Sequence, residues 1–223
     1  LGVGGVPYTV AKMLAESDKK DLGCHTGTIS DAFLELYKAG KLTNARKELD
    51  TSRSAWNLAM GSQALYDWLD AEPDIFHPGD LDYIHSVERI SRLSNVISIN
   101  GGVQLDLMGQ ENAESAGTRQ LSGIGGQMDF LEGAYRSKGG KGFICINASR
   151  VTKDGERKSN IVAAIPSGSA ISAPRTMIQY VATEYGIAEL SGKSLRERAE
   201  AMAAIAHPDF REELLKYAKE NFR

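Results

Sequence analysis

Short apolar, β-rich segments alternate along this chain with longer segments of helical periodicity. Such alternation predicts an α/β fold, in which helices flank a mostly parallel sheet. The segments expected to form strands are Asp21–His25, Ala55–Met60, Asn95–Asn100, Gly142–Asn147, Asn160–Ile165 and Ile178–Thr183. The segments expected to form helices are Val6–Leu14, Asp31–Ala39, Gly61–Asp70, Ser194–Ala206 and Phe210–Phe222. Gly40 is expected to end the second of these, and Ser194 with Glu197 three residues later predicts a capping box at the start of the fourth. No Pro/Ser-rich linker divides them, so we expect one domain over residues 1–223.

Glycine is concentrated near the expected strand ends. The chain has 23 glycines and 6 prolines, whereas average usage would give about 16 glycines in a chain of this length. Ligands of parallel sheets bind at the carboxyl ends of strands, so we expect a ligand site at the glycine-rich edge. The clusters are Leu1–Gly5, Asn100–Gly102, Gly123–Gly126, Ser137–Gly142 and Ser167–Ser169.

The composition excludes several classes of function. A net charge of −3 argues against a nucleic-acid partner, which requires a strong basic excess. No apolar run is long enough to span a bilayer, so no membrane partner is expected. Cys24 and Cys145 are too few for a disulfide scaffold, which favours a reducing, cytoplasmic setting. The four histidines and two cysteines lack metal-ligand spacing, so we expect no metal site.

The segment Gly123–Phe130 (GIGGQMDF) is the first candidate site. Consecutive glycines before a helix let backbone N–H groups converge on an anion or on the oxyanion of an attacked carbonyl. The alternative is a tight turn that needs positive φ angles.

Two further segments carry candidate catalytic groups. His25, which we expect at the end of a strand, can act as a base or as an orienting donor, or can be a buried, hydrogen-bonded histidine. Glu111 and Glu114 lie in an amide-rich loop and can act as nucleophile or base, or can belong to a solvated turn. Lys138 and Lys141 lie in a glycine-rich loop that lacks the full phosphate-binding pattern, so a solvated hairpin is the alternative.

The order of the motifs resembles the acetyl-CoA hydrolase/transferase family, which includes 4-hydroxybutyrate and butyrate:acetate CoA-transferases. The matching segments are LGVGGVP (1–7), LGCHT (22–26), LDLMGQ (105–110), NAES (112–115), SGIGGQMDF (122–130), AYRSKGG (134–140), VATEYGIAEL (181–190), GKSLRERA (192–199) and IAHPDFREE (205–213). The resemblance implies a CoA-transferase-like (NagB/RpiA-type) α/β fold and an enzyme that acts on CoA thioesters of short carboxylic acids. Coenzyme A would be a substrate, and no cofactor is implied.

The resemblance also assigns roles to residues. Gly125 and Gly126 would donate to the oxyanion, and CoA would contact Gly123, Ile124, Gly125, Gly126 and Gln127, with Lys138 as a candidate for its phosphates. Glu114 and His25 are the other catalytic candidates.

The family's nucleophilic glutamate follows the His-Thr pair, and here that position is Gly27. Glycine cannot form a glutamyl thioester. Three alternatives follow: a hydrolase that uses water, a transferase that uses Glu114 or Glu111, or a non-catalytic acyl-CoA-binding domain.

The resemblance covers only the C-terminal half of the family's length, and the chain opens on Leu1 rather than Met. We therefore expect a C-terminal domain whose N-terminal half is absent. That half, acyl-CoA, a carboxylic acid and a second copy in a homodimer are the expected partners.

Overall fold

The computed structural model describes residues 1–2 and 4–222. Val3, which belongs to the first glycine cluster, and Arg223 lie outside the described residues. The chain forms two compact units: unit 1 comprises Leu1–Asn100 and Glu132–Lys141, and unit 2 comprises Gly101–Leu131 and Gly142–Arg223. Whether residues 1–223 act as one domain stays a prediction.

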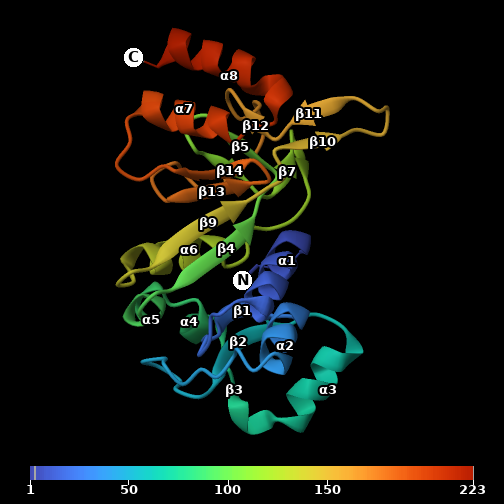
Figure 1. The fold of residues 1–223 in the computed structure, drawn as a ribbon, viewed down its shortest axis with the longest axis vertical. Coiled ribbons are helices and arrows are strands. Elements are labelled where there is room, and N and C mark those ends of the chain that lie inside the picture. Colours follow the sequence, from blue (N-terminus) through green and yellow to red (C-terminus); the bar gives the residue numbers. More distant parts are fainter. Residues whose placement is uncertain (3, 223) are drawn as a thin grey trace. The chain divides into compact units, whose positions relative to one another are not determined.

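Unit 1 is built on a parallel sheet of order β1-β2-β3 (Figure 1). Thr26 pairs with Trp56, and Ser54 pairs with Phe76. The elements of unit 1 are α1 (Gly5–Glu16), β1 (His25–Ile29), α2 (Asp31–Lys38), β2 (Ser54–Ala59), α3 (Gln63–Ala71), η1 (Pro73–Ile75), β3 (Phe76–Pro78), α4 (Leu81–Ile84) and α5 (Val87–Arg92). β4 (Ile97–Gly101) follows and leads into unit 2.

The core of unit 1 comes from the faces that the helices and strands bury. Ile29, Phe33, Leu65, Trp68 and Phe76 are all less than 10% exposed. Burying each large apolar side chain contributes roughly 1.5–3 kcal/mol. The apolar spacing therefore determines which helix faces meet the sheet.

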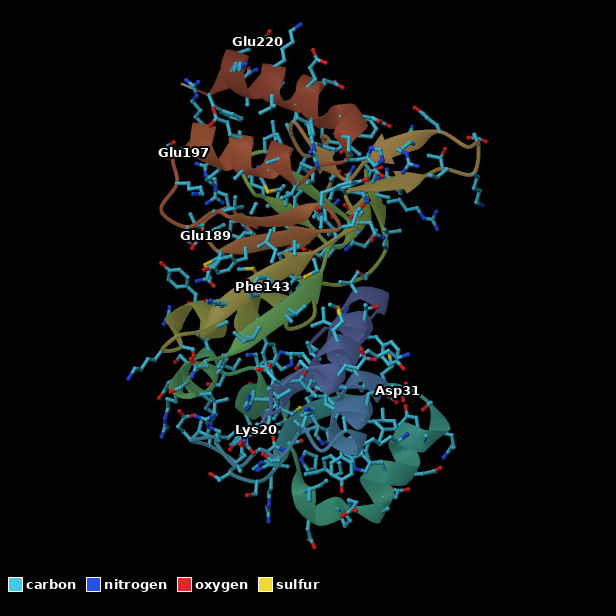
Figure 2. All side chains as sticks on the ribbon, viewed as in Figure 1. Lys20, Asp31, Phe143, Glu189, Glu197 and Glu220 are labelled. Carbon is cyan, nitrogen blue, oxygen red and sulfur yellow. The ribbon has the colours of Figure 1, made fainter. Side chains whose placement is uncertain are left out.

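Polar contacts fix the helix ends in unit 1. Asp31, the first residue of α2 (Figure 2), accepts hydrogen bonds from the backbone N and the Oγ of Ser62, at 3.0 and 2.7 Å. Ser62 is the residue that precedes α3, so this contact ties the starts of two helices together. Gly40, with φ of +66°, ends α2 as the sequence predicts, because glycine tolerates the left-handed conformation.

Unit 2 contains short strands in several small sheets. A three-stranded sheet has the order β12-β5-β6, β13 pairs with β9 in parallel and with β14 antiparallel, and β10–β11 and β7–β8 form hairpins. The elements are β5 (Gln104–Asp106), β6 (Glu111–Asn112), β7 (Ser115–Ala116), β8 (Arg119–Gln120), α6 (Gln127–Arg136, which continues into unit 1), β9 (Lys141–Cys145), β10 (Ser149–Val151), β11 (Arg157–Ser159), β12 (Ile161–Val162), β13 (Tyr180–Thr183), β14 (Gly186–Glu189), α7 (Leu195–Ala204) and α8 (Pro208–Asn221).

Side-chain contacts link the strands of unit 2. Tyr180 on β13 stacks on Phe143 of β9, with ring centroids 4.9 Å apart, and its hydroxyl donates to Glu189 of β14 at 3.0 Å. Leu105, Ile144, Val181 and Leu190 are fully buried in the core of unit 2.

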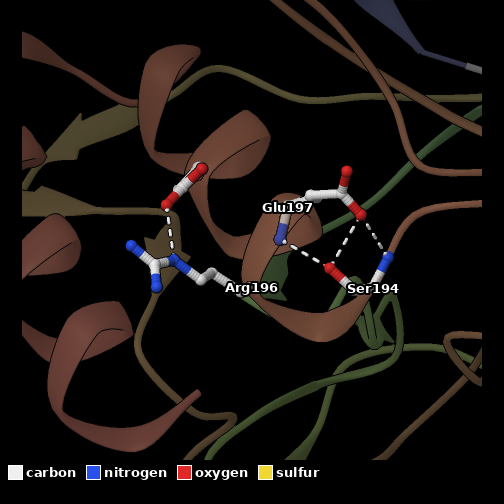
Figure 3. Close-up of polar contacts among 4 residues, drawn as sticks. Ser194, Arg196 and Glu197 are labelled. Atoms are coloured by element: carbon white, nitrogen blue, oxygen red, sulfur yellow. Dashed lines mark hydrogen bonds and ion pairs between the residues drawn. The ribbon is translucent and has the colours of Figure 1, made fainter. Parts of the chain in front are cut away.

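The predicted capping box at the start of α7 is confirmed (Figure 3). The backbone N of Glu197 donates to Ser194 Oγ at 3.3 Å, and the backbone N of Ser194 donates to Glu197 Oε2 at 2.8 Å. Two N–H groups that a helix start leaves unsatisfied are thereby bonded. One turn further, Arg196 Nε donates to Glu200 Oε1 at 3.0 Å.

The predicted α/β class is confirmed, but several boundaries differ from the prediction, and the strand expected at Asn160–Ile165 covers only Ile161–Val162. The strand expected at Asp21–His25 begins only at His25, because the Cys24 backbone N donates to Asn44 Oδ1 rather than to a neighbouring strand. The last helix begins at Pro208 rather than Phe210; proline fits the first helical turn, where its missing N–H costs nothing. Among the described residues, no helix is long and apolar enough to cross a membrane.

Candidate functional site

The glycine loop, residues 123–126, precedes α6 and is open to solvent. Gly123 to Gly125 are exposed and Gly126 is half-buried. Gly125 has φ of +57°, and apart from its own chain neighbours no atom of the described residues lies within 4 Å of where its Cβ would be. The left-handed conformation therefore explains this glycine, and the loop leaves open space on its outer side.

The start of α6 gives this loop its electrostatic character. The first N–H groups of a helix have no acceptor within the helix, and they carry the positive end of the helix dipole. Gly126 directly precedes Gln127, the first residue of α6. The loop and the first turn can therefore hold an anion or a developing oxyanion.

Glu114 is attached to the segment that leads into the glycine loop. Its backbone oxygen accepts from the N–H groups of Leu121 and Ser122, at 2.7 and 3.2 Å. Its side-chain Oε2 accepts from Ser172 Oγ at 2.7 Å, and the residue is half-buried. The structure thus holds one partly accessible carboxylate next to the chain that continues into the loop.

Asn112 shapes the turn that carries Glu114. Its Oδ1 accepts from the backbone N–H groups of Glu114 and Ser115, at 3.1 and 2.9 Å. This is the turn that asparagine commonly forms with the backbone two residues on. Ser172, which sequence reasoning missed, completes the turn by accepting from the Ala113 N–H at 2.9 Å.

Glu111 lies behind the loop and is fully buried on β6. Its Oε2 accepts a hydrogen bond from Gln127 Nε2. Burial raises the pKa of Glu111 to about 8; the bond from Gln127 acts in the opposite direction, and the charge of Glu114 adds to the increase. A buried carboxyl that is largely protonated at neutral pH is a poor nucleophile. Of the two glutamates, Glu114 is therefore the better candidate.

The comparisons with known proteins agree with the resemblance in the sequence. The family model described as "Acetyl-CoA hydrolase/transferase C-terminal domain" matches residues 61–218. The chain belongs to this family.

Relatives and solved structures extend the match across almost the whole chain. The chain is 46% identical to the butyryl-CoA:acetate CoA-transferase of Anaerostipes caccae, over 98% of this chain and 49% of that protein. It is 42% identical to the 4-hydroxybutyrate coenzyme A transferase of Clostridium kluyveri, over 100% of this chain and 50% of that protein. The crystal structure of RipA from Yersinia pestis has a TM-score of 0.89 at 39% identity, covering 99% of this chain and 48% of that one. The chain therefore spans about half the length of these relatives.

The structure of this acetyl-CoA hydrolase/transferase C-terminal domain corrects the position predicted for His25. We expected His25 and Thr26 at the end of a strand, but His25 is the first residue of β1. His25 Nε2 lies 2.8 Å from the backbone oxygen of Ile84. In the neutral tautomer that carries its proton on Nε2, the imidazole donates to this oxygen. Burial lowers the pKa of His25 to about 4, so the imidazole is neutral at pH 7 and is a weak base. An orienting role suits it better than general-base catalysis.

The predicted residues of this family domain are divided between its two units. His25 and Gly27 lie on β1 of unit 1, whereas Glu111, Glu114, the glycine loop and Gln127 lie in unit 2. Gly27 is half-buried between Thr26 and Thr28, which pair with Trp56 and Leu58 of β2. The structure brings together Glu111, Glu114, the glycine loop and Gln127 within unit 2.

Lys138 and Lys141 lie beyond the other end of α6 and are exposed. The backbone oxygen of Lys138 accepts from the Asn95 N–H at 2.8 Å. A Cβ on Gly140 would lie 2.1 Å from the backbone oxygen of Ala134. The glycines here are thus explained by a close turn after the helix. The phosphate role of Lys138 stays a prediction.

Sequence reasoning singled out Glu111 and Gln127 separately and missed the contact between them. Sixteen residues separate the two, and no short motif links them. Glu111 lies on the short strand β6. The only signal available from the sequence is a charged residue that has no Lys or Arg close to it along the chain.

Proposed function

We propose that this chain is the C-terminal domain of an enzyme that acts on CoA thioesters of short carboxylic acids. The observation that carries the proposal is the open glycine loop at the start of α6, with the Glu114 carboxylate attached to the segment leading into it. Membership of the hydrolase/transferase family supports the same reaction class.

In this proposal the thioester oxygen accepts hydrogen bonds from the N–H groups of Gly125 and Gly126 as negative charge develops on it. Donors held in place in advance stabilise that charge without reorganisation. The pantetheine arm of CoA lies along Gly123 and Ile124. Gln127 contributes through its backbone, because its side chain is bonded to Glu111.

Glu114 supplies the carboxylate in the hydrolase version of the reaction. It removes a proton from water, the hydroxide adds to the thioester carbon, and the C–S bond breaks. CoA leaves as the thiolate and takes up the proton from Glu114, and the acyl group leaves as a carboxylic acid. Ser172 Oγ donates to Glu114 Oε2 at 2.7 Å and orients the carboxylate, whereas the bond that Gln120 Nε2 donates to Oε1 is long, at 3.4 Å. Oε1 is therefore the oxygen that acts as the base in this proposal.

A second candidate is a domain that binds acyl-CoA without turnover. Gly27 favours it, because the family's nucleophile position holds no carboxylate. The N-terminal half is a proposed partner of either form, since the curated relatives are about twice as long as this chain. A second copy in a homodimer is also proposed.

The test measures thiol release from acetyl-CoA and butyryl-CoA, with and without added acetate. The chain is assayed alone and together with the N-terminal half of the Anaerostipes caccae relative. Release that is independent of acetate and lost in Glu114→Gln supports the hydrolase version. Release that requires acetate indicates a transferase. Calorimetric binding of CoA with no thiol release under any condition indicates the non-catalytic domain. The absence of both CoA binding and thiol release refutes the proposal.

A further inference from the structure

Glu111 is buried without the partners that a carboxyl normally requires. Its side chain is 0% exposed, and among the described residues no group is bonded to its Oε1. An unpaired polar atom in the interior is destabilising, so an apolar side chain of similar size would pack here at lower cost. A carboxyl at this position is therefore explained by a polar contact that an apolar residue cannot make.

The surroundings of Glu111 are shaped to hold it in one orientation. A Cβ on Gly102 would lie 2.6 Å from Glu111 Oε1 and 3.3 Å from its Cδ. Any side chain at position 102 would require the carboxyl to move from this orientation. The backbone is fixed as well, because the Glu111 N–H donates to the Ala173 oxygen at 3.0 Å and its own oxygen accepts from the Ser172 N–H at 2.8 Å.

In this orientation Glu111 accepts a hydrogen bond from Gln127, the first residue of α6. Gln127 is 9% exposed, and its Nε2 donates to Glu111 Oε2. Gly126 directly precedes Gln127 in the chain, and α6 continues from it. Motion of Gln127 would therefore move the N–H groups of the glycine loop and of the first helical turn.

We infer that Glu111 is a positioning residue, which holds Gln127 and thereby fixes the glycine loop, residues 123–126, relative to β6 within unit 2. The inference rests on the proposed function in taking that loop to be the oxyanion site. Glu111 itself touches no substrate. Glu114 is the charged group that acts on it from the neighbouring turn.

The experiment measures hydrogen exchange by mass spectrometry on the full chain at pH 7, in peptides that cover residues 121–130. Glu111→Leu removes the acceptor, Glu111→Gln keeps an acceptor oxygen for Gln127, and Glu132→Gln is a control on the same helix. We expect Glu111→Leu to lower protection of these peptides about tenfold, the effect of losing one hydrogen bond in a locally opening segment. Glu111→Gln and Glu132→Gln stay within about twofold of the wild type.

Equal protection in Glu111→Leu and the wild type overturns the inference. Where circular dichroism shows that Glu111→Leu does not fold, Gln127→Leu, which removes the donor of the same hydrogen bond, is compared with the wild type at pH 7. Loss of protection at residues 121–130 in Gln127→Leu supports the inference, and protection equal to that of the wild type overturns it. Because hydrogen exchange requires no turnover, it can refute the positioning role of Glu111 whether or not the thiol-release assay refutes the proposed function.

Discussion

The replacement Glu111→Gln should remove a pH dependence from the stability of this protein. The pKa of Glu111 is raised from 4.5 to about 8 in the folded chain, chiefly by burial. Between these values the folded state keeps a proton that the unfolded state has lost. The contribution of this group to stability is therefore complete below about pH 4.5, falls as the pH rises, and is lost above about pH 8.

The magnitude follows from the two pKa values. The difference between 4.5 and about 8, at about 1.4 kcal/mol for each pH unit, amounts to a loss of up to about 5 kcal/mol. The total free energy of unfolding of a typical domain is only about 5–15 kcal/mol, so a loss of this size is measurable. Opening of the first turn of α6 would admit water to the carboxylate and make the observed loss smaller than this limit.

Urea unfolding between pH 5 and pH 9 measures the effect. The two tryptophans, Trp56 and Trp68, both lie in unit 1, so their fluorescence follows unit 1, whereas far-UV circular dichroism follows both units. We expect the free energy of unfolding from circular dichroism to fall with pH in the wild type and in Glu132→Gln, and to fall much less in Glu111→Gln. Parallel pH profiles for the wild type and Glu111→Gln would refute the reasoning.

Three other substitutions test the site and the fold. Glu114→Gln should lower kcat/KM for thiol release about 100-fold or more, the usual contribution of a general base, while the exposed control Glu156→Gln leaves it unchanged; equal losses in both would remove Glu114 from the reaction. Gly27→Glu should create a glutamyl-CoA adduct on incubation with acyl-CoA, detected by mass spectrometry of the intact chain, and finding neither an adduct nor acetate-dependent turnover would contradict the alignment of this loop with the family's nucleophile. Ser194→Ala should cost about 1 kcal/mol through loss of the helix cap to Glu197, seen as a lower Tm; an unchanged Tm would mean that the capping box of α7 contributes little.

The sequence by itself determined the features that depend on neighbours along the chain. Ser194 and Glu197 predicted the start of α7, and Gly40 the end of α2, because helix ends are satisfied by residues three or four positions away. The order of the motifs likewise identified the family that the family model then confirmed.

Only the tertiary structure decided the state and the contacts of the polar groups. His25 was expected at the end of a strand and lies at the beginning of β1, because the Asn44 side chain binds the preceding N–H from twenty residues away. The neutral state of Glu111 and its bond to Gln127 depend on burial by segments that are distant in the sequence. Desolvation is a property of the packed interior, so no local pattern could have predicted it.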